Sequence, residues 1–355
     1  MKTKMKLVIW DLDNTLWKGT LTENDNIVIS DEVLNIIKTL DQRGILQSIA
    51  SKNDFDVAYE KLKKAGIEDM FLYPQINWNP KSENIRFIIK KINIGDDAVA
   101  FIDDQNFELN EVKYHIPDIN CINSSEISGL LDREEMMPEY ITNDSFMRRI
   151  LYMNDQVREE KEKEFTGTSE EFLQTLGMVL ELAPAQEEDL MRCAELTVRT
   201  HQLNSTGYTY TFDELRDMIE DDQYIFAISG LKDRYGEYGK IGLLLIKIED
   251  EKKWTLKLLL TSCRVMSRGI GGAILKMLIN YAIKHEIELY AEFVPTNRNR
   301  IMAITYASMG FHVCEEKDGV QTLRCERKTV FEMPDYLEIT NKVEALQNEM
   351  ECAVD

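Results

Sequence analysis

The sequence lacks the marks of several protein classes. No apolar run approaches the roughly eighteen residues that a membrane-spanning helix needs, and the opening MKTKMKLVIW lacks the apolar segment and cleavage site of a secretory signal. The six cysteines show no CxxC or Cys/His spacing, which disfavours a zinc site or a disulfide framework. We therefore expect a cytoplasmic protein without a membrane partner.

Positive charge is also scarce. The chain carries 42 Lys and Arg against 63 Asp and Glu, a formal net charge of -21. Such a field repels nucleic acid and anionic membrane surfaces, so we expect neither as a partner. A small phosphorylated substrate remains compatible, because a metal ion and one or two nearby cations reverse the field within a single pocket.

The first part of the chain alternates between strand and helix patterns. A length of 355 residues suits two domains of roughly 150 residues each. We expect strands at 5–12, 45–51, 71–76 and 98–104 and helices at 31–44, 56–67 and 83–94. This alternation predicts a parallel α/β sheet of the Rossmann-like type, whose ligands lie beyond the carboxyl ends of the strands.

The second part has a different pattern. Four strand-like runs, YIFAIS, KIGLLLIKI, WTLKLLLTSCRV and ELYAEFV, surround the helical GAILKMLINYAIKH and predict a mixed sheet with helices. Between the two parts, a charged helical segment leads into Thr168 and Glu171, which have the spacing of a capping box. We expect a first domain at 1–135, a helical connector at 136–170, a second domain at 171–330 and a helical tail at 331–355.

Polar side chains gather at the predicted strand ends of the first domain. They are Asp11, Asp13, Ser51, Lys81, Asp103 and Asp104, with Lys81 in the loop NWNPKSE. Neighbouring carboxylates are costly unless a cation lies between them, and hard oxygen ligands suit Mg²⁺. Carboxylates, a hydroxyl and an ammonium together suit the transfer of a phosphoryl group. The alternative is that the Asp-Asn and Asp-Asp pairs only start turns.

These segments resemble the motifs of the haloacid-dehalogenase superfamily. DLDNT resembles its DxDxT motif, SIAS ends in its motif-two hydroxyl, and FIDD resembles its fourth motif. The resemblance implies that Asp11 is the nucleophile, that Asp13 is the general acid and base, and that Ser51 and Lys81 hold the phosphoryl oxygens. The intervals between these four residues are too short for a sizeable cap domain, which favours a macromolecular substrate or a lid from the second domain.

The same resemblance implies a magnesium site. Its ligands are Asp11, the backbone carbonyl of Asp13, and Asp103, while Asp104 is either a direct ligand or a neighbour of the ligands. The order of Asp103 and Asp104 is left open. Thr15 is expected to shape the turn that aims Asp11 and Asp13 at one point.

A second group of residues lies in the segment SRGIGGAILKML and its sequel. Glycines at a strand-to-helix junction let backbone N–H groups approach a phosphate, although a glycine-rich helix start without a ligand is the alternative. With TNRNRIMAITYASMGF, the segment resembles the acyl-CoA-dependent N-acetyltransferase fold, GNAT. The residues that this resemblance assigns to the phosphates of coenzyme A or of a phosphopantetheine arm are Arg268, Gly269, Gly271 and Ala273. Asn297 or Asn299 belongs to the second motif, and Tyr306 either protonates the departing thiolate or packs against Phe311.

The two halves together resemble the FkbH family. RTHQLNSTG at 199–207, TSCRVMSRG at 261–269 and VPTNRN at 294–299 carry this resemblance. It implies that the protein takes a glyceryl group from an acyl phosphate donor, 1,3-bisphosphoglycerate. The protein then releases phosphate and loads the group as a thioester onto the phosphopantetheine of an acyl carrier protein.

Several alternatives accompany this interpretation. WKGTLTEND stands where the family has a more glycine-rich loop, which would favour a different acyl group. Cys263 relays the acyl group or is a buried thiol, and His201 contacts the carrier, acts as a base or is only solvated. The rival functions are a phosphatase whose second domain only binds a partner, and acetyl-CoA-dependent N-acetylation.

Overall fold

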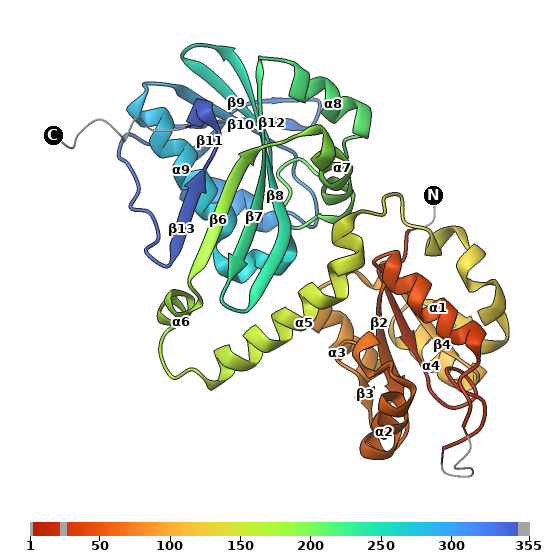
Figure 1. The fold of residues 1–355 in the computed structure, drawn as a ribbon. Helices are drawn as coiled ribbons and strands as arrows, with labels where there is room; N and C mark the ends of the chain where they lie inside the picture. The colour runs from red at the N-terminus through yellow and green to blue at the C-terminus, as the bar shows by residue number, and fades with distance from the viewer. Residues whose placement is uncertain (1–2, 22–26, 347–355) are drawn as a thin grey trace. The chain divides into compact units, whose positions relative to one another are not determined.

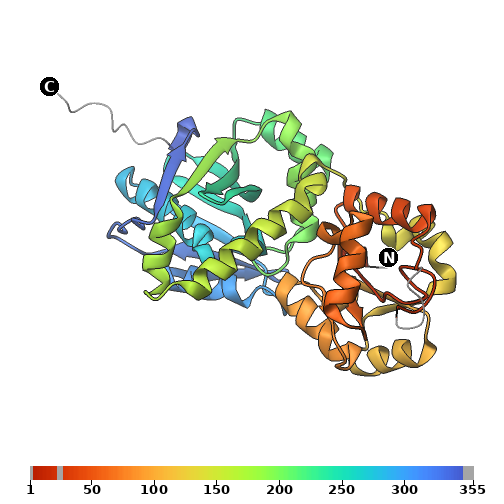
Figure 2. The same cartoon turned by 60° about the horizontal axis from the view of Figure 1, so that its bottom comes forward.

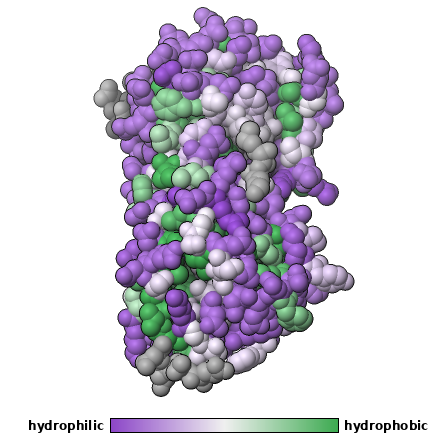
Figure 3. Space-filling model, turned by 90° about the vertical axis from the view of Figure 1, so that its right-hand side faces the viewer, coloured by the Kyte–Doolittle hydropathy of each residue, from purple (hydrophilic) through white to green (hydrophobic). Residues whose placement is uncertain are grey.

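The structure is a computed structural model that describes residues 3–21 and 27–346 (Figure 1). The chain divides into two compact units, Met1–Met153 and Asn154–Asp355, and the division falls within helix α5 (Asn143–Glu164). The predicted α/β class is confirmed, with a parallel sheet in the first unit and a mixed sheet in the second. The face in Figure 3 is predominantly hydrophilic, with groups of hydrophobic side chains between the polar ones.

The first unit is built on a five-stranded parallel sheet in the order β3-β2-β1-β4-β5. Its strands are β1 (Leu7–Trp10), β2 (Leu46–Ser51), β3 (Gln75–Ile76), β4 (Val99–Asp103) and β5 (Asn120–Asn123). The central strand β1 pairs with β2 on one side and with β4 on the other. All strands point the same way, so their carboxyl ends lie along one edge of the sheet.

Helices cover both faces of this sheet (Figure 2). They are α1 (Asp31–Gln42), α2 (Phe55–Ala65), α3 (Lys81–Ile92) and α4 (Asn106–His115). Because side chains alternate along a strand, Val8 and Trp10 share a core with α1 and α2, whereas Leu7 and Ile9 share one with α3 and α4. The near-continuous apolar strands follow from this burial on both faces.

The second unit contains an eight-stranded sheet in the order β11-β12-β10-β9-β8-β7-β6-β13. The strands are β6 (Met178–Pro184), β7 (Tyr224–Asp233), β8 (Gly236–Asp250), β9 (Lys253–Thr261), β10 (Glu288–Phe293), β11 (Phe311–Lys317), β12 (Val320–Cys325) and β13 (Leu337–Asn341). The β9–β10 and β6–β13 pairs are parallel, and the other pairs are antiparallel.

The described residues of the second unit also contain the α-helices α6 (Ser169–Leu176), α7 (Leu190–Arg199), α8 (Phe212–Glu220), α9 (Ile270–Lys284) and α10 (Arg300–Ser308). Helices α6, α9 and α10 share one hydrophobic core with the sheet, while α7 and α8 contact strands β8 and β7. The capping box of Thr168 and Glu171 is present at the start of α6. No helix of residues 3–21 and 27–346 is both long and apolar enough to cross a membrane.

The predicted helical tail is wrong over residues 337–341. These residues form β13, which pairs in parallel with β6 along its length from Met178 to Leu182. The sequence LEITN contains β-branched Ile339 and Thr340 and buries Leu337, a composition that suits a strand at the edge of a sheet. Residues 347–355 of the predicted tail lie outside the described residues.

Candidate active site

The parallel strands bring the predicted phosphoryl-transfer residues to one edge of the first sheet. Asp11 directly follows β1 and donates its backbone N–H to the carbonyl of Ile102 at 2.9 Å. Ser51 and Asp103 are the last residues of β2 and β4. Lys81 is the first residue of α3 rather than a loop residue. All four of these polar side chains are buried, which is uncommon for charged groups unless they are paired.

Lys81 lies between two carboxylates. Its Nζ atom is 2.8 Å from Oδ1 of Asp11 and 2.5 Å from Oδ2 of Asp103. Burial alone would lower the pKa of Lys81, but the two carboxylates outweigh burial and raise it above the ordinary lysine value. The ammonium therefore stays charged and offsets part of the negative charge of this buried group.

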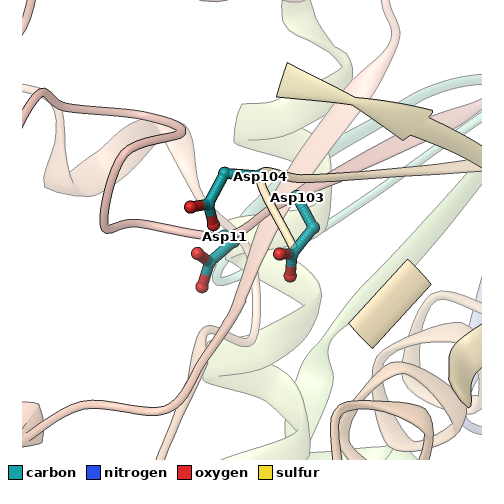
Figure 4. A group of neighbouring side chains, drawn as sticks. All are labelled: Asp11, Asp103 and Asp104. Atoms are coloured by element: carbon teal, nitrogen blue, oxygen red, sulfur yellow. The ribbon is translucent and has the colours of Figure 1, made fainter. Parts of the chain in front are cut away.

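Three carboxylates form a potential metal site. Oxygen atoms of Asp11, Asp103 and Asp104 all lie within 4.8 Å of one another (Figure 4). Burial raises the pKa of Asp11 to about 6 despite Lys81, and burial also raises the pKa of Asp103 and of Asp104. Oδ1 of Asp104 is buried without a hydrogen-bond partner among the described residues. Converging oxygens, one of them unpartnered, fit a divalent cation such as Mg²⁺.

The Asp13 carboxylate is held by three N–H donors. Its Oδ1 accepts hydrogen bonds from Nε1 of Trp17 at 2.8 Å and from the backbone N–H of Leu21 at 3.1 Å. Its Oδ2 accepts one from Nδ2 of Asn53 at 3.0 Å. This carboxylate does not belong to the group formed by Asp11, Asp103 and Asp104. The implied metal contact of Asp13 is through its backbone carbonyl, which takes no part in these three hydrogen bonds.

Sequence reasoning missed Trp17 and Asn53, although both lie close to the motifs. Both side chains are buried, and Asn53 comes two residues after Ser51. An amide and an indole placed just after motif residues are a weak signal, because such side chains also pack in turns. In WKGTLTEND, which begins at Trp17, residues 22–25 lie outside the described residues.

Only short elements separate the motifs in the described part of the chain. Between Asp13 and Ser51 the described residues contain helix α1, and between Ser51 and Lys81 they contain α2, the short 3₁₀ helix η1 (Glu68–Met70) and β3. A cap domain is therefore not formed by the described residues of these intervals.

The glycine-rich turn of the second unit starts α9. Gly269 has a φ of 70°, in the left-handed region that glycine adopts without strain, and its carbonyl accepts the N–H of Ala273. Gly271 approaches β9 closely, because a Cβ placed there would lie 3.3 Å from Oγ1 of Thr261. The guanidinium of Arg268 is largely buried and lies 3.3 Å from Oε2 of Glu162. Arg268 is thus engaged within its own unit.

The two asparagines of the second motif differ in position. Asn297 is exposed. Asn299 is buried; its Nδ2 donates to the carbonyls of Asn204 and Val294, and its Oδ1 accepts the N–H of Thr296. Asn299 therefore holds the backbone of two loops together.

Tyr306 lies in the hydrophobic core. Its ring packs edge-on against Phe293 and Phe311, with centroid distances of 6.1 and 5.2 Å, which is the packing role that the sequence left open. Its hydroxyl is buried without a hydrogen-bond partner among the described residues. Burial raises the pKa of Tyr306 above its usual range, and the nearby Ser205 hydroxyl offsets only part of this effect.

Cys263 and His201 lie outside regular strands. Strand β9 ends at Thr261, so Cys263 belongs to the following 3₁₀ helix η6 (Cys263–Arg268), where it is half-buried. The expected strand position of Cys263 is therefore wrong. His201 is half-buried in the loop between α7 and α8.

Comparisons with known proteins gave structural likenesses. No family model matches the chain, and no curated protein matches it. The N-terminal part of a Bacteroides fragilis protein, containing a phosphatase domain complexed with Mg, is 32% identical and has a TM-score of 0.32. That match covers 34% of this chain and 36% of that chain.

Two N-acetyltransferases are also similar to this chain. The ribosomal-protein-S18-alanine N-acetyltransferase from Escherichia coli is 16% identical over 41% of this chain and 90% of its own, with a TM-score of 0.32. The PaiA N-acetyltransferase from Thermoplasma acidophilum, in complex with coenzyme A, is 17% identical over 42% of this chain and 99% of its own, with a TM-score of 0.33. The solved structures similar to this chain thus include a phosphatase-like domain and acetyltransferase-like domains.

Proposed function

We propose that the protein is a Mg²⁺-dependent enzyme that loads a glyceryl or related acyl group onto an acyl carrier protein. The donor is an acyl phosphate such as 1,3-bisphosphoglycerate, and the acceptor is the phosphopantetheine thiol of the carrier. The observation that carries the proposal is the buried group of Asp11, Asp103 and Lys81, with Asp104 beside it. That the protein belongs to the FkbH family is part of the proposal, and this part rests on the sequence motifs.

The chemistry of the donor divides the reaction into two bond cleavages. In 1,3-bisphosphoglycerate one phosphate is bound to the acyl carbon and the other is an ester of the terminal hydroxyl. Attack of the carrier thiol on the acyl carbon breaks the C–O bond, forms the thioester and releases the first phosphate. A glyceryl product also requires hydrolysis of the ester phosphate, in which the P–O bond breaks.

The Asp11 site suits the second cleavage. Asp11 attacks phosphorus and takes the phosphoryl group, Asp13 gives a proton to the departing alkoxide, and Asp13 then takes a proton from the water that hydrolyses the phosphoaspartate. Ser51 and Lys81 hold the phosphoryl oxygens. If the acyl phosphate were cleaved at phosphorus, the product would be a free carboxylate, which is no longer activated for attack by a thiol. The two cleavages therefore need different nucleophiles.

Mg²⁺ would be held by Asp11 and Asp103, with Asp104 and the carbonyl of Asp13 beside it. When bound, it neutralises charge on the phosphoryl oxygens. The chain's own part is to place the Asp11 carboxylate against phosphorus, to supply the Lys81 ammonium, and to keep Asp13 oriented through Trp17 and Asn53.

Phosphorus NMR tests this division directly. The protein, Mg²⁺ and a phosphopantetheinylated carrier are incubated with 1,3-bisphosphoglycerate, and the acyl and ester phosphates are followed separately. We expect both to be released with carrier present, and Asp11→Asn to preserve the ester phosphate. Release of the ester phosphate at the wild-type rate by Asp11→Asn would remove Asp11 as the nucleophile.

The second candidate function is a phosphatase whose GNAT-like unit only binds a partner. It is favoured by the position of all the phosphoryl-transfer residues, which lie within Met1–Met153. This function predicts phosphate release at the same rate with and without carrier, and no thioester. The same incubation therefore separates the two functions.

A further inference from the structure

Strands β9 and β10 separate at one end of the second sheet. They pair in parallel from Lys253 to Leu256 on β9 and from Glu288 to Ala291 on β10. Beyond that point β9 continues to Thr261, paired with β8 on its other side, and β10 continues in pairing with β12. The inner edges of β9 and β10 therefore present backbone groups that no longer bond to each other.

The chain's own residues 203–205, which we call the strap, occupy this gap. The N–H of Ser205 donates to the carbonyl of Leu259 at 3.1 Å, and the N–H of Thr261 donates to the carbonyl of Leu203 at 2.9 Å. The N–H of Leu259 donates to Oγ of Ser205 at 3.1 Å. On the opposite side, the N–H of Val294 donates to the carbonyl of Ser205 at 3.1 Å. The strap thus bonds to the inner edge of β9 and to Val294, the residue that directly follows β10.

The strap is firmly anchored. Asn204 and Ser205 are fully buried. Oδ1 of Asn204 accepts the N–H groups of Thr206 and Gly207, which turns the chain away after the strap. Nδ2 of Asn299 donates to the carbonyl of Asn204 at 3.1 Å. Removing the strap would leave these buried backbone groups unpaired, which is costly.

The strap lies close to the glycine-rich turn that starts α9. Gly271 of this turn lies against the side chain of Thr261, whose backbone N–H donates to the carbonyl of Leu203 in the strap. A phosphate at the first turn of α9 would therefore lie close to the last residue of β9. A pantetheine chain carries two amides, and an extended amide chain binds a free strand edge by backbone hydrogen bonds. The strap already holds that edge.

We infer that the strap stays in the gap between β9 and β10 in the folded protein, where it is hydrogen-bonded like a short strand. By occupying the gap it excludes coenzyme A and acyl-CoA thioesters from it. The second unit then does not use acyl-CoA as a substrate through this gap. The inference is independent of the proposed function, since it concerns occupancy of the gap and not turnover.

Hydrogen exchange resolved to single amides tests this inference on the full chain. We expect the amides of Leu259, Thr261 and Val294 to exchange at least about a thousandfold more slowly than in the unfolded chain. We also expect millimolar coenzyme A to leave all three rates unchanged. Fast exchange in the free protein, or a change at these amides on adding coenzyme A, would overturn the inference.

A pair of variants tests the anchoring. Asn299→Ala removes the side-chain donor to Asn204 and Val294, so exchange at Thr261 and Val294 should accelerate at least about tenfold. Asn297→Ala, two residues earlier and exposed, should leave both rates unchanged. Equal rates in the two variants would overturn the anchoring by Asn299, while the wild-type measurement would still decide whether the strap fills the gap.

Discussion

The ammonium of Lys81 lies 2.8 Å from a carboxylate oxygen of Asp11 and 2.5 Å from one of Asp103, with all three side chains buried. Two carboxylates so close together are tolerated in the absence of a metal ion because this cation lies between them. We therefore expect Lys81 to contribute to the stability of the first unit, beside its proposed role in phosphate binding.

Lys81→Met should destabilise the metal-free protein. Removing one partner of a buried ionic group leaves uncompensated charge, and we expect a loss of about 3–5 kcal/mol in the free energy of unfolding. Denaturant unfolding with a chelator present measures this loss. The matched control is Lys64→Met, an exposed lysine on α2, which should stay within about 0.5 kcal/mol of wild type. Equal stability of the two variants would contradict the structural role of Lys81.

Mg²⁺ should raise the thermal stability of the protein. A ligand that binds only the folded state at about a hundred times its Kd stabilises that state by about 2.7 kcal/mol. The shift in Tm should disappear in Asp103→Asn, because that variant removes a charged ligand. The size of the shift in Asp104→Asn shows whether Asp104 binds the ion directly. Asp56→Asn changes an exposed carboxylate on α2 that does not belong to the group, so this variant should keep the full shift. A shift that survives in Asp103→Asn would show that the ion binds elsewhere.

Asn53 and Trp17 should affect turnover more than substrate binding. Asn53→Ala and Trp17→Phe each remove one donor to Asp13 while leaving Ser51 and Lys81 in place. A misplacement of a catalytic group by about 1 Å costs roughly a hundredfold in rate. We expect a fall of that order in kcat with little change in KM, measured by phosphate release. The control is Asn79→Ala, at an exposed asparagine, which should leave kcat unchanged. An unchanged kcat in both Asn53→Ala and Trp17→Phe would contradict the positioning of Asp13 by these two side chains.

Tyr306→Phe should leave activity unchanged. The hydroxyl is buried in the core without a partner among the described residues, so its removal takes away no group that faces a substrate. Loss of an unsatisfied buried hydroxyl should also leave the free energy of unfolding within about 1 kcal/mol of wild type. Steady-state thioester formation and thermal unfolding check both expectations, and a large fall in thioester formation would restore the catalytic role of Tyr306.

The first sheet and its polar edge could be predicted from sequence because local patterns determine them. Apolar runs that end in Asp11, Ser51 and Asp103 indicate buried strands, and parallel strands place their ends together. Strand β5 and helix α4 were not predicted, since NCIN is short and only half-buried, and α4 buries few apolar residues.

Other features depend on tertiary contacts that no local pattern contains. The bond from Asn53 to Asp13 joins segments that follow two different strands, and the strap joins the loop after α7 to β9 and to the residue after β10. The sequence pointed to Asn297 or Asn299 but did not separate them. Burial and hydrogen bonding do, because only Asn299 is tied to the strap. Residues 337–341 were expected to belong to a helical tail, yet they form a strand beside β6.

The intact mass of a phosphopantetheinylated carrier protein is the most direct test of carrier loading. After incubation with the protein, Mg²⁺ and 1,3-bisphosphoglycerate, we expect the carrier to gain the mass of a glyceryl group without phosphate. With Asp11→Asn the rate at which this product forms should fall at least about a thousandfold, as expected for loss of a nucleophile. Phosphate release at full rate with no mass gain on any carrier encoded beside this protein would contradict the account and leave a phosphatase.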